Sequence, residues 1–100
     1  MSNAIGYQSI AIGSDLYANG TSSIAIGGDD VLYIPAADIA KASTYTGRNL
    51  IAAGIYTPTQ ANGAAAITIG RRAISNGSMS IALGLDANSQ GLASLAVGTN

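Results

Sequence analysis

The chain has 100 residues, which is enough for one domain but near the lower limit for a self-sufficient hydrophobic core. Only 9% of the residues are charged and the net charge is -1, which excludes the basic surface that sequence-independent nucleic-acid binding requires. There is no His and no Cys, so the usual nucleophile–base pairs and thiolate metal sites are excluded, and we expect no catalytic residues, no cofactor and no metal.

The N-terminal residues lead directly into a repeat. No basic segment followed by an apolar run, as in a signal peptide, precedes the repeat, and no apolar span of 18 residues follows it. We therefore expect no membrane segment, and a chain that is made in and stays in the cytoplasm unless it is cut from a larger protein.

Five pentads that end in glycine recur along the chain. They alternate small and β-branched or other apolar residues, which is the period of a strand. The pentads are SIAIG at 9–13 and 23–27, AITIG at 66–70, SIALG at 80–84 and SLAVG at 94–98. Within each block the period is 14 residues, so each pentad is predicted to be a short strand of a stacked repeat architecture.

A second glycine lies midway between successive pentads. Twelve of the thirteen glycines follow a seven-residue step, and Gly28 does not. Because glycine readily adopts a positive φ where a chain reverses, 14 residues are predicted to form two short strands and two turns, which is one coil of a narrow roll. With coils stacked about 4.8 Å apart, roughly seven coils are expected in one all-β domain spanning 1–100.

The strand residues divide into two alternating sets. We expect the Ile pair of each pentad to fill the roll and the Ser and Ala residues to face outward, although alternation alone does not decide between the two faces. The coil positions are Ile10, Ile12, Gly13, Ile24, Ile26, Gly27, Ile67, Ile69, Gly70, Ile81, Leu83, Gly84, Leu95, Val97 and Gly98. A thin roll cannot hide all of its apolar residues, so an obligate homotrimer is predicted.

These repeats resemble the head repeats of trimeric autotransporter adhesins, the YadA-like heads. The resemblance rests on the pentads, the midpoint glycines and the small residues Ala18, Ala73 and Ala87. The stretch GYQSIAIG at 6–13 also looks like repeats found in phage fibre and other virion proteins. The resemblance covers 4–27 and 61–98 and implies a left-handed parallel β-roll or solenoid assembled as an intertwined homotrimer.

The middle section, 28–60, departs from the repeat. Gly27 and Gly70 are 43 residues apart, three periods plus one, so 46–54 is interpreted as a degenerate coil and 38–42 as a candidate for another. Pro35 and Pro58 are interpreted as irregular turns. Because insertions in repeats often bind partners, this section supplies most of the candidate partner contacts. They are Tyr33, Tyr45, Arg48 and Tyr56, and Arg71 and Arg72 from the following coil join them.

Each candidate contact has a plainer interpretation. The tyrosines would equally well cover the rim of a coil, and Arg71–Arg72 reads more simply as a solvated pair on a turn than as a contact with an acidic partner. Asp29–Asp30 is interpreted as polar turn residues because no calcium-binding pattern follows it.

Two functions are compatible with such a block. The first is a phage capsid decoration (cement) protein that ties capsomers together on the virion surface, with the major capsid protein or another virion protein as partner and no contact with nucleic acid or membrane. The alternative is the head module of a trimeric adhesin or phage fibre that binds a host-surface ligand, at a bacterial cell surface in the adhesin case. The printed sequence contains no heptads and no amphipathic barrel strands of an adhesin stalk and anchor, so the first function is preferred.

Overall fold

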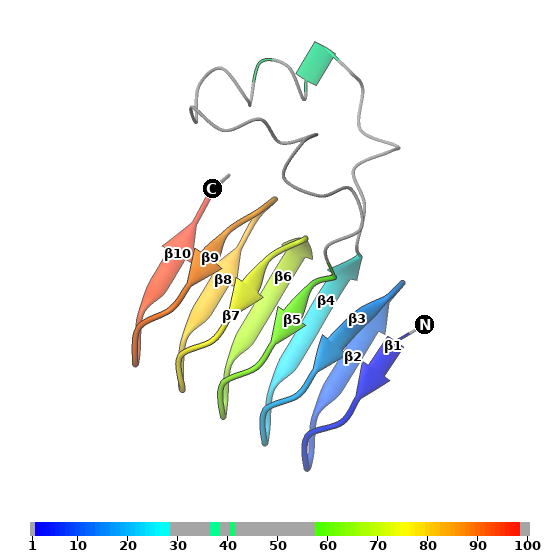
Figure 1. Cartoon of the computed structure of the whole chain (residues 1–100), viewed down its shortest axis with the longest axis vertical. Helices are drawn as coiled ribbons and strands as arrows, with labels where there is room; N and C mark the ends of the chain where they lie inside the picture. The colour runs from blue at the N-terminus through cyan, green and yellow to red at the C-terminus, as the bar shows by residue number, and fades with distance from the viewer. Residues whose placement is uncertain (1, 29–36, 39–40, 42–57, 99–100) are drawn as a thin grey trace.

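A computed structural model describes residues 2–28, 37–38, 41 and 58–98 and shows an all-β parallel solenoid (Figure 1). Ten short strands form two five-stranded sheets that face each other. The strands are β1 (Ser2–Ala4), β2 (Ile10–Gly13), β3 (Leu16–Ala18), β4 (Ile24–Gly28), β5 (Gln60–Ala61), β6 (Ile67–Arg71), β7 (Ile74–Ser75), β8 (Ile81–Leu83), β9 (Asn88–Ser89) and β10 (Leu95–Val97). Each coil contributes one odd-numbered and one even-numbered strand, so the odd sheet is β1-β3-β5-β7-β9 and the even sheet is β2-β4-β6-β8-β10.

The predicted pentads are the even-numbered strands, and they stack in register. Ile10 lies beside Ile24, Ile24 beside Ile67, Ile67 beside Ile81, and Ile81 beside Leu95. The glycines that end the pentads also align, as Gly27 does with Gly70. The parallel in-register stacking of 14-residue units predicted from the repeat is therefore confirmed.

The described residues form five stacked coils, and the expectation of roughly seven is wrong. Strand β4 pairs directly with β6, so no coil lies between them. The 43 residues from Gly27 to Gly70 therefore correspond to one 14-residue coil and 29 additional residues, 29–57. Segment 46–54 lies outside the described residues. Of segment 38–42, only Asp38 and Lys41 are described, and both are helical and not in a strand.

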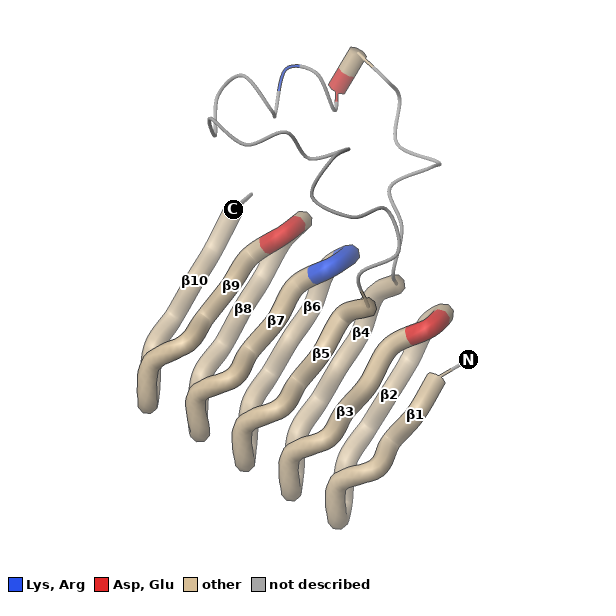
Figure 2. Tube along the Cα trace, viewed as in Figure 1, with Lys and Arg blue, Asp and Glu red and all other residues tan. Residues whose placement is uncertain are grey.

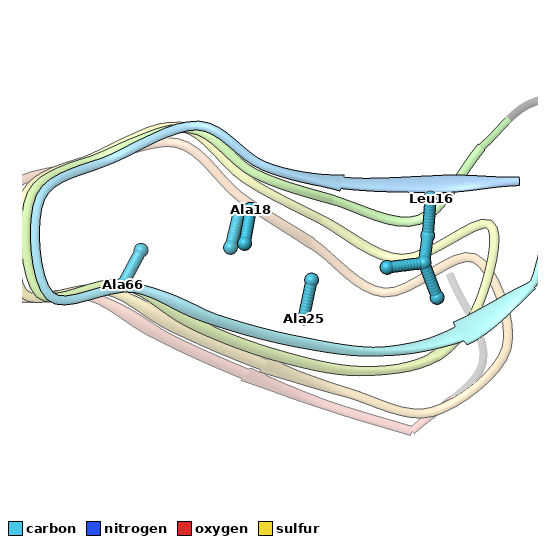
Figure 3. Close-up of a cluster of buried hydrophobic side chains, with 5 residues drawn as sticks. Leu16, Ala18, Ala25 and Ala66 are labelled. Carbon is cyan, nitrogen blue, oxygen red and sulfur yellow. The ribbon is translucent and has the colours of Figure 1, made fainter. Parts of the chain in front are cut away.

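The interior of the solenoid is filled by small side chains, which reverses the expected orientation of the pentads. Ala25, Thr68 and Ala82 are completely buried, whereas Ile10 and Ile12 are 48% and 56% exposed. The two strands of such a short coil lie so close together that only Ala, Ser and Thr fit between most of them. Leu16 is the one larger aliphatic side chain among the fully buried residues that the structure describes, and Figure 3 shows it beside Ala18 and Ala25 in the space between the sheets.

Four of the five pentads begin with serine, and these serines are buried or half-buried, not turned outward as expected; the fifth pentad begins with the buried Ala66. The hydroxyl groups of Ser9, Ser80 and Ser94 donate to the carbonyl oxygen of the glycine three residues earlier, at 2.6, 2.6 and 2.7 Å. Ser thus fixes the turn that precedes the strand, which is a familiar use of a short hydroxyl side chain.

The glycines that end the pentads and the midpoint glycines have different physical roles, although both follow the same seven-residue step in the sequence. Gly13, Gly27, Gly70, Gly84 and Gly98 have positive φ between 106° and 158°, as expected for a chain reversal. The midpoint glycines do not share this conformation. They are required by close stacking: a Cβ built on Gly20 would lie 2.0 Å from the carbonyl oxygen of Gly63 in the next coil.

Non-glycine residues occupy the left-handed region at both corners of the coil. At one corner they are Gln8, Ser22, Ala65, Met79 and Ala93, and at the other Asp15, Arg72 and Asp86, all with φ between 53° and 61°. The amide N–H groups at the first corner bond to the preceding coil, as Ala65 does to the Thr21 carbonyl oxygen at 2.7 Å. These bonds between coils hold a conformation that costs an L-residue about 1–2 kcal/mol.

Candidate assembly surface

The outer face of the even sheet carries two rows of apolar side chains, which we call the apolar face. The rows follow from the strand register and from the inward orientation of the central Ala or Thr of each strand. One row is Ile10, Ile24, Ile67, Ile81 and Leu95, and the other is Ile12, Ile26, Ile69, Leu83 and Val97. All ten side chains are exposed or half-buried. This is a continuous apolar surface of the kind that marks a protein–protein contact.

The outer face of the odd sheet is different in composition. Its central row, one residue per strand, is Asn3, Tyr17, Gln60, Ile74 and Asn88. Three of these five residues are amides, whereas the apolar face has no polar side chain. The solenoid therefore has one surface suited to water and one suited to being covered.

A ladder of side-chain amides runs along one corner of the coils. The Nδ2 atoms of Asn19, Asn62 and Asn76 donate in turn to Asn62 Oδ1 at 2.7 Å, Asn76 Oδ1 at 2.7 Å and Gln90 Oε1 at 2.8 Å. Such stacked amides stabilise parallel in-register coils. This ladder was not predicted from the sequence, although the sequence contains a signal for it: each of the four residues directly precedes a midpoint glycine.

The charged residues of the solenoid lie at the opposite corner, between the even strand of one coil and the odd strand of the next (Figure 2). Arg72 and Asp86 form a bidentate ion pair there, with Nε to Oδ1 at 2.9 Å and Nη2 to Oδ2 at 2.5 Å. Both residues are buried, Arg72 with 2% exposure. Arg71 is half-buried at the end of β6.

The prediction that Arg72 is solvated or reaches a partner is therefore wrong. Its guanidinium is engaged within the chain by Asp86 of the adjacent coil, and a group that is 2% exposed is not available to another surface. Asp15 occupies the equivalent corner of an earlier coil and is exposed. The N-terminal amino group lowers the pKa of the Asp15 carboxyl, through a hydrogen bond and its positive charge.

Thr59, near the start of the third coil, binds to Gly28 at the end of β4 and to Gly70 in β6. Its buried hydroxyl accepts a hydrogen bond from the Gly28 N–H at 3.2 Å and lies 2.8 Å from the Gly28 oxygen and 2.6 Å from the Gly70 oxygen. One hydroxyl hydrogen can serve either oxygen. The sequence analysis did not single out Thr59, and its position directly after Pro58 is the only signal that would have pointed to it.

The remaining predicted contacts, Tyr33, Tyr45, Arg48 and Tyr56, lie outside the described residues. Within the described ranges, no three acidic side chains gather in a way that could hold a metal ion. The helical residues that the structure describes include no segment of the length and hydropathy needed to cross a membrane. Comparison of the chain with protein-family models, curated proteins and solved structures found no match.

Proposed function

We propose that this chain is a non-enzymatic structural protein that assembles as an intertwined homotrimer of left-handed β-rolls and decorates a phage capsid. The observation that carries the proposal is the apolar face, two unbroken rows of five aliphatic side chains on one side of a solenoid whose other side is mostly polar. The resemblance of the pentads to YadA-like head repeats supports the same assembly.

Burial of the apolar face supplies the energy of assembly. Completing the burial of a half-exposed aliphatic side chain stabilises by about 1 kcal/mol, and each chain offers ten such side chains, seven of them Ile, in a flat array. The face is only two rows wide, so three copies can converge on an axis with their apolar faces inward and their odd sheets toward solvent. The buried Ala and Thr inside each coil then make the single roll rigid, while the Ile rows hold the rolls together.

A rigid threefold block suits the threefold or local threefold points of an icosahedral capsid. Matching symmetry triples every contact that one chain makes, so weak individual contacts become a stable attachment. The attachment would tie neighbouring capsomers together through buried surface and not through chemistry. The partner is the major capsid protein or another virion protein.

The test compares virions of the encoding phage made with and without this chain. We expect virions that lack the chain to lose their contents at lower temperature and at higher salt concentration than complete virions. Addition of the purified chain should restore the resistance of the complete virions. Ile69→Lys on the apolar face is the matched variant. We expect it to fold but not to restore the resistance of the virions.

Equal resistance of the two kinds of virion would overturn the stabilising role. A reconstruction that places the chain at the tip of a fibre or on a bacterial surface would favour the alternative, a head module that binds a host-surface ligand.

A further inference from the structure

The two ends of the solenoid are more apolar than its middle. Ten large apolar or aromatic side chains are exposed in the described part of the chain, and seven of them belong to the first or the last coil. These seven are Ile5, Tyr7, Ile10, Ile12, Leu92, Leu95 and Val97. Strands β1 and β2 at one end, and β9 and β10 at the other, each pair on one side only.

The midpoint glycines show what each coil requires of the next one. A Cβ on Gly6, Gly20, Gly63 or Gly77 would lie 2.0–2.1 Å from the carbonyl oxygen of the equivalent glycine in the following coil. Every one of these four positions therefore excludes any other residue. The requirement comes from the following coil and not from the turn itself.

Gly91, in the last described coil, follows the same pattern, although no backbone atom of the described residues lies close enough to require a glycine there. The nearest atoms to a Cβ built on Gly91 are Cβ and Oγ of Ser94, at the ordinary contact distances of 3.5 and 3.7 Å. Among the described residues, no atom lies within 4 Å of a Cβ built on Gly98, the last glycine of the other series. Both positions are thus shaped to receive a further coil.

We propose that the last coil of one copy receives the first coil of a second copy, so that solenoids stack head to tail. Strand β1 then extends the odd sheet beside β9, and β2 extends the even sheet beside β10. In this register the carbonyl oxygen of the second copy's Gly6 lies against Gly91. It has the same position relative to Gly91 that the Gly91 oxygen has relative to Gly77 within one chain. The Leu95 N–H donates to the second copy's Ser9 oxygen, just as Ile81 donates to Ser94 at 2.9 Å.

The exposed side chains of the two ends match in this register. Tyr7 of the second copy lies over Leu92, which are 76% and 72% exposed in the single chain. Ile10 and Ile12 continue the two rows of the apolar face beyond Leu95 and Val97, so the contact is continuous with the face that the proposed function uses. Because one end contacts a different end, the association does not close and produces columns.

The experiment is sedimentation velocity of the purified chain from micromolar to millimolar concentration. We expect multiples of the smallest oligomer to appear as the concentration rises. Gly91→Ala should leave the unfolding temperature and the smallest oligomer unchanged, because its Cβ meets only Ser94, yet weaken end-to-end association about tenfold or more.

Gly77→Ala is the matched control within the stack. Its Cβ would lie 2.1 Å from the Gly91 oxygen of the same chain, so it should lower the unfolding temperature. Leu92→Asp, at a 72% exposed position of the same end, is a second variant that should abolish the multiples without unfolding the chain.

Two results would overturn the proposal: a wild-type chain that stays at its smallest oligomer at millimolar concentration, or a Gly91→Ala chain that stacks as strongly as wild type. The proposed function fails separately, if the smallest oligomer itself is a monomer.

Discussion

Left-handed non-glycine residues are the costliest local feature of this fold. Ala65 has a φ of 57° and lies exposed at a corner, where its N–H bonds to Thr21 of the preceding coil. The hydrogen bond needs the backbone conformation but not the side chain. The same holds for Ala93, whose N–H bonds to Ser78.

Ala65→Gly should therefore stabilise the chain by about 0.5–1 kcal/mol, because glycine adopts this conformation without steric cost. Thermal unfolding followed by circular dichroism measures the change. The control is Ala64→Gly, an adjacent exposed alanine without a positive φ, which should destabilise. A lower unfolding temperature for Ala65→Gly would contradict the role given to this corner.

Thr59 contributes to the stability of the chain through the hydrogen bonds of its buried hydroxyl. Thr59→Val keeps the shape of the side chain but leaves the Gly28 N–H without the acceptor shown here, so we expect a loss of about 1–3 kcal/mol. Thr59→Ser keeps the hydroxyl and should lose much less. Chemical denaturation of the three proteins gives the comparison, and equal stability of the Val and Ser variants would show that the hydroxyl is dispensable.

At the scale of the strand, the pentad is defined by which of its two faces is inside. Ala82 is completely buried between the sheets, and its neighbour Ile81 is half-buried on the apolar face. Ala82→Leu should destabilise the chain by about 1–3 kcal/mol or prevent folding, because Ala82 packs closely against the buried Ala73 and Ala87, which leave no room for a larger side chain.

Ile81→Leu is the matched change on the other face and should leave thermal stability nearly unchanged. If Ala82→Leu were tolerated and Ile81→Leu were not, the assignment of inside and outside would be reversed.

The strands and their register could be predicted from the sequence, because the 14-residue period and the alternation within SIAIG encode both. Which face of each strand lies inside could not be predicted, because the alternation of small and large residues is compatible with either face pointing inward. The orientation depends on the distance between the sheets, which follows from the few residues between Gly13 and Leu16 and is a tertiary property. The ion pair of Arg72 was missed for the same reason, because Asp86 is 14 residues away and adjacent only after coiling.

At the scale of the whole molecule, the 29 additional residues separate the second coil from the third in sequence, although β4 and β6 of these coils pair directly. The register equates Gly28 with Arg71, and Gln60 with Ile74, so removal of 29–57 would join the second and third coils in phase. Pro58 would then occupy the position of Arg72, which has a φ of 58° that proline cannot adopt. Deletion of 29–57 with Pro58→Asp should therefore fold as an uninterrupted five-coil solenoid.

Circular dichroism and sedimentation check this variant against a deletion of 29–56, which leaves one extra residue at the corner and should be less stable. A variant of the in-phase deletion that did not fold would show that the removed section belongs to the core. This distinction could not be predicted from the sequence, because a spacing of 43 residues is compatible with three imperfect coils as well as with one coil and an insertion.

The central claim is that other copies of this chain cover the apolar face. Sedimentation equilibrium at micromolar concentration tests it most directly. We predict a smallest folded species of three times the 9.9 kDa chain mass, and dissociation of that species by Ile26→Lys at the middle of the face. A folded wild-type species of 9.9 kDa would contradict the claim.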